Sequence, residues 1–445
     1  MLFHVNEPAA DHPHPLLSRV VAVKPGETRA LLWSFAYFFC LLAGYYVLRP
    51  VRDEMGLASG VKNLPWLFTA TFFVMLAVVP IYGALVARLP RQRFIPLVYH
   101  FFVANIIVFW LMLTQNVAIA TTAQVFFVWI SVFNLFAVSV FWSFMADLYG
   151  SEQGKRLFGF IAAGGSAGAL LGPAIAVTLA ETIGRANLLI IAALLLECAV
   201  FCAMRLESAA AAFRAERTAT AGTQTKPPEA ALGGSWIAGI VMIARSKYLA
   251  GIALWVALLS LAGTFLYFQQ ANIVSALTDD PNKRTAIFAR IDLAVSLLTI
   301  VVQFLATGKL IKRFGAGPAA AFLPLVFALG FIALWATPML WVVIAFQAVQ
   351  RAANFAISNP AREVLFTVVD REEKYKAKNV IDNVVFRGSD ALFGWLFTAL
   401  RGAGMELGAI SLATVPVTAA WLALALALGR MQEKRATATA TPLDK

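Results

Sequence analysis

Residues 30–55 read ALLWSFAYFFCLLAGYYVLRPVRDEM, an apolar run that ends in four charged residues. A helix that crosses a bilayer needs about 20 apolar residues, and this run is long enough. If the helix continues to about residue 56, Arg49 and Arg52 share one face and Arg49 pairs with Asp53 one turn later. Pro50 could instead kink or end the helix. The charges are either an interfacial cap, with arginines reaching to lipid headgroups, or part of a functional site.

The whole 445-residue chain has the composition of a membrane protein. It is 60% hydrophobic and 13% charged, with a mean hydropathy of +0.76, values outside the range of soluble domains. Twelve apolar segments begin near residues 30, 64, 94, 119, 157, 186, 249, 285, 317, 338, 379 and 407. The sequence therefore predicts an all-α polytopic membrane protein with twelve transmembrane helices in two six-helix halves.

A polar segment divides these helices into two sets of six. We expect an N-terminal tail at 1–29, halves at 30–205 and 249–429, a linker at 206–248 and a C-terminal tail at 430–445. The linker is rich in Ala, Thr and Pro between residues 207 and 235, which indicates flexibility, and 236–248 could form a short helix on the membrane surface. The halves also resemble each other, since residues 83–88 match 308–313, and Asp147 and Lys155 recur as Asp370 and Lys378.

The net charge of +12 reflects topology and not a nucleic-acid partner, because the basic residues fall in alternate loops. With the N-terminus in the cytoplasm, most of the 36 Lys and Arg are cytoplasmic, and so is the C-terminus. The first 28 residues contain no apolar signal-peptide core, so we expect a soluble tail there. The three cysteines all lie in apolar segments and indicate neither disulfides nor a metal site.

Three predicted helices carry polar residues at the same helical spacing, which predicts one shared aqueous interior. The stripes are Asp292, Ser296, Thr299 and Gln303; Gln347, Arg351, Asn354 and Ser358; and Asn379, Asn383, Arg387 and Asp390. Interhelical hydrogen bonding alone could explain any one amide or hydroxyl. The two arginines are harder to explain in that way, because a charge at mid-bilayer costs roughly 2.5 to 3.5 kcal/mol.

Two further features of the helices each have a structural and a functional interpretation. Glu197 stands alone among apolar residues and is either protonated, paired with a base, or part of proton coupling. Gly164, Gly168 and Gly172 form a small-residue series that favours close helix packing over ligand contact.

The glycines around Ser151 lack the spacing of a phosphate loop, and no nucleophile triad or acidic metal cluster is evident. We therefore expect no enzyme and no cofactor.

Several motifs resemble known transporter families. The six-plus-six plan resembles the major facilitator superfamily. Three segments are similar to motifs of the ATP/ADP translocase family of nucleotide transporters: Leu48-Arg-Pro-Val-Arg-Asp53, Phe141-Trp-Ser-Phe with Glu152-Gln-Gly-Lys-Arg156, and Lys376-Ala-Lys-Asn-Val-Ile-Asp382. The resemblance implies substrate roles for Arg52, Glu152 and Lys376 or Lys378. Pro50 and Asp147 depart from the family pattern.

The favoured hypothesis is a secondary transporter of an anionic, nucleotide-like solute that works by alternating access, with exchange of the ATP/ADP type implied by the resemblance. Alternatives are a proton-coupled major-facilitator exporter of a drug-like or other small solute, and a scaffold or sensor that moves nothing. We expect a monomer in the inner membrane, contacting the lipid bilayer and a small-molecule substrate. The candidate substrate residues are Arg49, Arg52, Glu152, Arg351, Asn354, Lys376, Lys378 and Arg387, with Asp292 and Glu197 as candidates for coupling.

Overall fold

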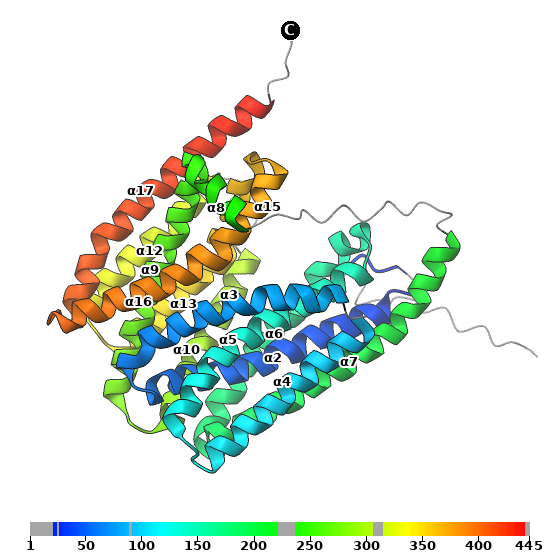
Figure 1. Ribbon diagram of the computed structural model, residues 1–445, viewed down its shortest axis with the longest axis horizontal. Coiled ribbons are helices and arrows are strands. Elements are labelled where there is room, and N and C mark those ends of the chain that lie inside the picture. The colour runs from blue at the N-terminus through cyan, green and yellow to red at the C-terminus, as the bar shows by residue number, and fades with distance from the viewer. Residues whose placement is uncertain (1–20, 25, 89–90, 221–235, 306–314, 441–445) are drawn as a thin grey trace, which may run out of the picture.

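The computed structural model describes residues 21–24, 26–88, 91–220, 236–305 and 315–440, and these residues are almost entirely helical (Figure 1). Helices dominate because a chain inside a bilayer must satisfy its backbone hydrogen bonds within the spanning segment. The helices of the N-terminal part are α2 Thr28–Ala58, α3 Leu64–Arg88, α4 Arg91–Thr114, α5 Ile119–Leu148, α6 Ser151–Ile183 and α7 Arg185–Thr220, with a short 3₁₀ turn, η1, at Val61–Asn63. We call α2 to α7 the N-terminal group.

The second part of the chain contains shorter and more interrupted helices. They are α8 Trp236–Arg245, α9 Lys247–Leu277, α10 Pro281–Leu305, α12 Ala316–Ala336, α13 Leu340–Ala353, α14 Asn359–Leu365, α15 Arg371–Val380, α16 Phe386–Gly402 and α17 Leu407–Ala440. One π-helical turn, η2 at Asn354–Ser358, joins α13 to α14, and another, η4 at Ile381–Val385, joins α15 to α16. A 3₁₀ turn, η3, covers Phe366–Val368. We call α9 to α17 the C-terminal group.

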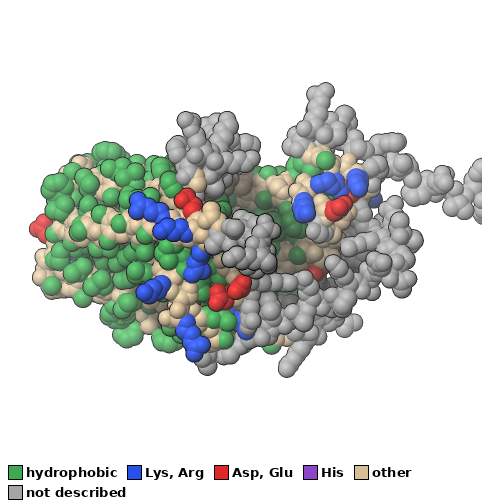
Figure 2. Space-filling view, turned by 90° about the horizontal axis from the view of Figure 1, so that it is seen from above, with side chains coloured by type: hydrophobic (Ala, Val, Ile, Leu, Met, Phe, Trp, Pro, Cys, Tyr) green, Lys and Arg blue, Asp and Glu red, His purple; other side chains and the backbone are tan. Residues whose placement is uncertain are grey.

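Eleven helices in the described residues are long and apolar enough to cross a membrane. The all-helical membrane architecture is thus confirmed, whereas the count of twelve is not. The segment expected to begin near residue 379 forms η4 and the 17-residue α16, which carries Arg387 and Asp390. Figure 2 shows hydrophobic side chains covering one end of the visible face, with Lys and Arg gathered toward the middle and the other end.

The tightest helix contact in the N-terminal group is between α2 and α6. A Cβ added at Gly164 would lie 2.6 Å from the carbonyl oxygen of Phe35, and one added at Gly172 would lie 2.6 Å from that of Ala43. Gly168, between them, faces Phe39 in the same way. The glycine series therefore lets two backbones touch, as the packing interpretation predicts.

The two groups approach each other at the helix ends farthest from the chain termini and diverge toward the termini (Figure 1). At the near end, the backbone N–H of Arg185 donates to Asn282 Oδ1 at 2.9 Å. Trp395 Nε1 donates to Thr69 Oγ1 at 3.0 Å, which joins α16 to α3. The side chain of Arg185 also pairs with Glu54, which is fully buried. The Arg185–Asn282 and Trp395–Thr69 hydrogen bonds connect the two groups, whereas the Arg185–Glu54 pair joins α7 to α2 within the N-terminal group.

The linker differs from the expectation. Helix α7 continues to Thr220 instead of ending near 205, because residues 207–217 are rich in Ala, Glu and Arg, which favour helix. Helix α8 packs on α15, since a Cβ at Gly239 would lie 2.7 Å from the Lys376 carbonyl oxygen. The rest of the linker, the tail 1–20, the last five residues and the matching segment 308–313 lie outside the described residues.

Candidate functional site

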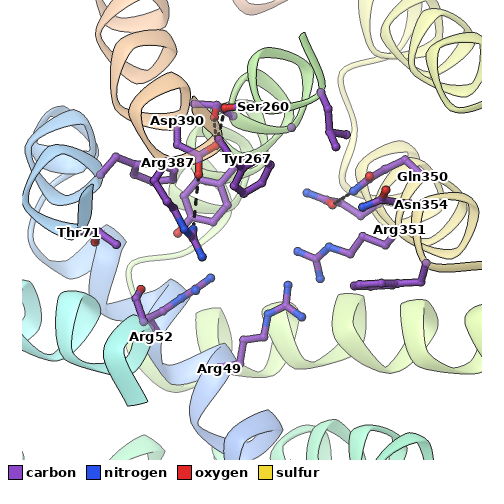
Figure 3. Close-up of a pocket in the computed structure, with 18 of the residues that line it drawn as sticks. Arg49, Arg52, Thr71, Ser260, Tyr267, Gln350, Arg351, Asn354, Arg387 and Asp390 are labelled. Atoms are coloured by element: carbon purple, nitrogen blue, oxygen red, sulfur yellow. Dashed lines mark hydrogen bonds and ion pairs between the residues drawn. The ribbon is translucent and has the colours of Figure 1, made fainter. Parts of the chain in front are cut away.

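A cavity of about 290 Å³ lies between the two groups, and four arginines line it. Arg49 and Arg52 come from α2, Arg351 from α13 and Arg387 from α16. Figure 3 shows that the guanidinium groups of all four extend toward the same space. Helix α2 continues unbroken through Pro50 to Ala58, so Arg49 and Arg52 are on one helix face and not at a frayed end.

Each of these arginines has a carboxylate partner. Arg351 Nη1 donates to Asp292 Oδ1 at 2.6 Å, and Arg49 Nη1 lies 3.6 Å from the same oxygen. Arg52 Nη2 donates to Asp53 Oδ1 at 2.5 Å, so the expected pairing of Arg49 with Asp53 is wrong: Arg49 turns toward α10 instead.

The fourth pair lies within α16, where Arg387 Nη1 and Asp390 Oδ2 are 3.5 Å apart. Ser260 Oγ on α9 donates to the other Asp390 oxygen at 2.6 Å. The side chains of Arg49, Arg52 and Arg351 are 14%, 17% and 13% exposed, so they are largely removed from solvent. Because Arg49 and Arg351 share Asp292, four guanidinium groups face three carboxylates, and the cluster has one positive charge in excess.

Aromatic and amide side chains form the rest of the cavity wall. The aromatic ones are Phe68, Phe127, Tyr267, Phe327, Phe355 and Phe386. Gln350 Nε2 donates to Gln347 Oε1 at 2.8 Å, and Gln347 Nε2 donates to Gln270 Oε1 at 2.6 Å, which fixes the orientation of the amides. Asn354 also lines the cavity. The site thus combines a cationic cluster with flat apolar surfaces and hydrogen-bonding amides.

The two π-helical turns lie next to the arginines. Turn η2 begins three residues after Arg351, and η4 ends two residues before Arg387. A π turn inserts an extra residue into a helix and rotates the residues after it, and such turns often occur at functional sites. This explains why the predicted stripes do not continue: Ser358 is fully buried, and Asn383 Nδ2 donates to Asn379 Oδ1 at 2.5 Å instead of lining the cavity.

The structure brings some of the predicted site residues together and leaves others apart. Arg49, Arg52, Arg351, Asn354 and Arg387 line the cavity. Asp292 lies behind the cavity wall, is 2% exposed and contacts two of those arginines. The rest of its stripe does not line the cavity; Ser296 Oγ, for example, donates to the Ala169 carbonyl at 2.8 Å. That part of the shared-interior prediction is wrong because this face of α10 packs against α6.

Glu152, Lys376, Lys378 and Glu197 lie away from the cavity. Glu152 is exposed in the first turn of α6, whereas its neighbours Gln153 and Arg156 bind Glu27. Lys378 Nζ pairs with Glu363 at 2.6 Å, and Lys376 is in α15 beneath α8. Glu197 Oε2 lies 3.4 Å from His100 Nε2 on the outer surface, so it has the basic partner that one interpretation predicted.

Helix α9 contributes site residues that the sequence reasoning missed. Ser260, Thr264 and Tyr267 line the cavity at positions i, i+4 and i+7, which is the same helical spacing as in the other stripes. Thr264 Oγ1 donates to Asp390 and Tyr267 Oη donates to Asp53, each at 3.3 Å. This spacing is visible in the sequence of residues 249–277 and is the signal that identifies them.

A multi-pass helical bundle with a charged cavity between two groups of helices is an architecture that membrane transporters use. The sequence profile of the TLC ATP/ADP transporter family matches residues 123–431, and the chain belongs to that family. The resemblance inferred from the motifs is therefore confirmed. No curated protein matches the sequence.

Two solved structures share the fold. The first is a bacterial homologue of the human lysosomal transporter Spinster in an inward-facing and unoccupied conformation, with 15% identity and a TM-score of 0.57 over 93% of this chain and 98% of that one. The second is a variant of the nucleoside transporter NupG, with 13% identity and a TM-score of 0.57 over 91% of this chain and 99% of that one. Family and neighbours are transporters and not enzymes.

Proposed function

We propose that this transporter works by alternating access and exchanges anionic, nucleotide-like solutes across the membrane in the manner of ATP/ADP exchange. The observation that carries the proposal is the convergence of Arg49, Arg52, Arg351 and Arg387 on one cavity between the two groups of helices. Planar guanidinium groups present paired N–H donors that match the oxygens of phosphate and carboxylate.

The charge balance of the site supports an anionic substrate. The excess positive charge of the cluster is unfavourable inside a membrane protein, and closing the two groups around it would remove it further from water. A bound anion offsets that charge and provides acceptors for the guanidinium N–H groups that the carboxylates do not use. Closure is thereby coupled to substrate binding.

The uncharged part of the cavity supports a substrate with a flat ring system as well as an anionic group. Phe127 and Phe386 lie beside arginines of the cluster, with the guanidinium carbon of Arg52 5.2 Å from the Phe127 ring centre. Rings of this kind stack on aromatic bases, and oriented amides such as Gln350 hydrogen-bond to base edges. A nucleotide has both features.

The proposed architecture follows from the sequence and the position of the cavity. Residues 30–205 and 249–429 act as two halves that rock about the site. From the excess of Lys and Arg in one set of loops we infer that both termini are cytoplasmic. We propose that the protein lies in the inner membrane. We propose that the functional unit is a monomer.

The proton-coupled exporter receives less support from the contacts. It requires a carboxylate that titrates along the substrate path, and the two candidates were Asp292 and Glu197. Asp292 is held by two arginines, and Glu197 lies outside the cavity against His100. These contacts favour anion exchange.

Counterflow in proteoliposomes tests the proposal. Vesicles loaded with unlabelled ADP, ATP, adenosine or an organic dicarboxylate are diluted into the same solute carrying a label. We expect saturable uptake of the nucleotides that persists when the proton gradient is dissipated. Uptake of only neutral or cationic solutes, or uptake abolished by dissipating the proton gradient, would contradict it.

A further inference from the structure

Asp292 joins the two groups of helices through a single oxygen. Its Oδ1 accepts a hydrogen bond from Arg351 of the C-terminal group at 2.6 Å and lies 3.6 Å from Nη1 of Arg49 in the N-terminal group. The other two carboxylates of the site form ion pairs within one helix, Asp53 with Arg52 on α2 and Asp390 with Arg387 on α16. Among the carboxylates of the site, Asp292 is the one whose ion pairs cross from one group to the other.

The second oxygen of Asp292 is not used in this way. Oδ2 is buried and has no hydrogen-bond partner among the described residues. Buried polar atoms in native proteins are nearly always satisfied, so a carboxylate with one engaged oxygen and one orphaned oxygen requires an explanation beyond packing. Both arginines also face the cavity, where a substrate anion could contact them.

We propose that Asp292 is a built-in counter-anion that ties the two groups together when no substrate is bound and so prevents the substrate-free protein from reorienting. The proposal rests on the proposed function and deepens it, since it assigns the requirement for exchange to one residue. Alternating access must move α2 relative to α10, and that movement withdraws Arg49 from Asp292. A buried arginine without its carboxylate is strongly unfavourable, so the substrate-free protein resists the step.

A bound anion removes this obstacle. Guanidinium groups have five N–H donors each, and the contacts of Arg49 and Arg351 with Asp292 use one nitrogen of each. Phosphoryl oxygens between the two arginines keep Arg49 compensated while α2 moves. The loaded protein can therefore cross from one orientation to the other, and the unloaded protein cannot.

Replacing Asp292 should allow the protein to change orientation without a bound substrate. In Asp292→Asn the tie is lost, and Arg49 and Arg351, which both contact the same oxygen in the wild type, repel each other across the boundary between the groups. The two groups then separate without a substrate. We expect the variant to catalyse net flux in addition to exchange.

The experiment compares net efflux with exchange in the same proteoliposomes. Vesicles are loaded with labelled ADP and diluted into buffer with or without unlabelled ADP, and the ratio of the two efflux rates is measured. Wild type should release label only when ADP is outside. Asp292→Asn should raise the ratio of net efflux to exchange by at least roughly tenfold, because a buried ion pair no longer opposes the substrate-free step.

Asp390→Asn is the matched control, because it removes an equally charged carboxylate that also pairs with an arginine of the cluster, but within one helix. Its exchange rate is expected to change, but its ratio of net efflux to exchange should stay at the wild-type value. A ratio in Asp292→Asn equal to that of wild type, or an equal increase in Asp390→Asn, overturns the counter-anion role while leaving anion exchange intact. Absence of any ADP exchange by wild type overturns the proposed function itself.

A second measurement covers the case in which Asp292→Asn is inactive. Spin labels at Val117 and Met339 are placed on exposed loops at the helix ends where the two groups approach, one in each group, in a protein without native cysteines. Without ADP, the label-to-label distance distribution should shift to longer distances in Asp292→Asn relative to wild type, and Asp292→Glu should behave as wild type. An unchanged distribution in Asp292→Asn contradicts the tie.

Discussion

Gly164 of α6 and Phe35 of α2 are in backbone contact: a Cβ at Gly164 would lie 2.6 Å from the Phe35 carbonyl oxygen and 3.1 Å from its ring. Helix α2 also carries Arg49 and Arg52, so this packing fixes the position of half of the arginine cluster. The glycine series on α6 is therefore part of the scaffold of the site, although no glycine of that series lines the cavity.

Gly164→Ala should lower stability because the added methyl group has no room against the α2 backbone. We expect a loss of about 1 to 3 kcal/mol, typical of overpacking. Gly159→Ala on the same helix is the control, since a Cβ there meets nothing within 4 Å and alanine favours helix. Unfolding temperatures of the purified proteins provide the comparison. An equal decrease in both variants would contradict the packing account.

Arg387→Gln should impair exchange of nucleotides, because a guanidinium group that lines the cavity is removed from α16. Hydrogen bonds to charged groups contribute about 1.5 to 3 kcal/mol, which corresponds to roughly a tenfold to hundredfold loss in apparent affinity. Arg401→Gln on the same helix is the control, since Arg401 is exposed and donates to the Met405 carbonyl at 2.9 Å. Initial exchange rates over a range of substrate concentrations give the KM of each variant, and these KM values are compared. A similar KM for both variants would exclude Arg387 from the site.

Lys378 should affect stability through its ion pair with Glu363, and it should not contact the substrate. The pair is 2.6 Å apart, and Glu363 is 49% exposed, so the coupling energy should be within about 0.2 to 1 kcal/mol. Lys378→Gln, Glu363→Gln and the double variant form a cycle whose unfolding temperatures measure that coupling. Exchange KM should stay within about twofold of wild type in all three, a margin of about 0.4 kcal/mol. A large KM increase in Lys378→Gln that is absent in Glu363→Gln would restore the direct role that the family resemblance implies.

Glu27 should make stability depend on pH in the acidic range. Burial works to raise its pKa, but hydrogen bonds from Arg156, the Lys24 backbone and Gln153 outweigh burial and hold the pKa below its ordinary value of 4.5. The ionised carboxylate therefore stabilises the fold above pH 4.5, and that contribution disappears as the pH falls through the lowered pKa. The difference in unfolding temperature between wild type and Glu27→Gln should be largest near neutral pH and shrink under acid. A difference independent of pH would show that charge is not involved.

Much of the architecture was predictable because apolar length alone identifies a spanning helix. Hydropathy located the segments, and the rarity of arginine in lipid singled out Arg351 and Arg387, which line the cavity. The segment that begins near residue 379 was harder to predict, because charges and a π turn interrupt it and leave a 17-residue α16. Helix periodicity assumes 3.6 residues per turn, and one π turn is enough to rotate Asn379 and Asn383 away from Arg387.

Partners across the two groups could not be predicted. Arg49 was expected to pair with Asp53 because a neighbour one turn away is visible in the sequence, whereas its partner Asp292 is on α10. Motif similarity had a related limit, since it identified Glu152, Lys376 and Lys378 as members of family motifs without showing that they lie outside the cavity. Glu27, which lies in no motif, binds Arg156 of the Glu152–Arg156 segment.

The proposed function requires the arginine cluster to recognise the negative charge of a nucleotide. Calorimetric titration of ADP and adenosine into the purified protein tests it most directly, because the two ligands share the ring system and differ in charge. We predict that wild type binds ADP at least about tenfold more tightly than adenosine and that Arg351→Gln loses most of this difference. Equal affinities for the two ligands in wild type, or a difference that Arg351→Gln leaves unchanged, would contradict the account.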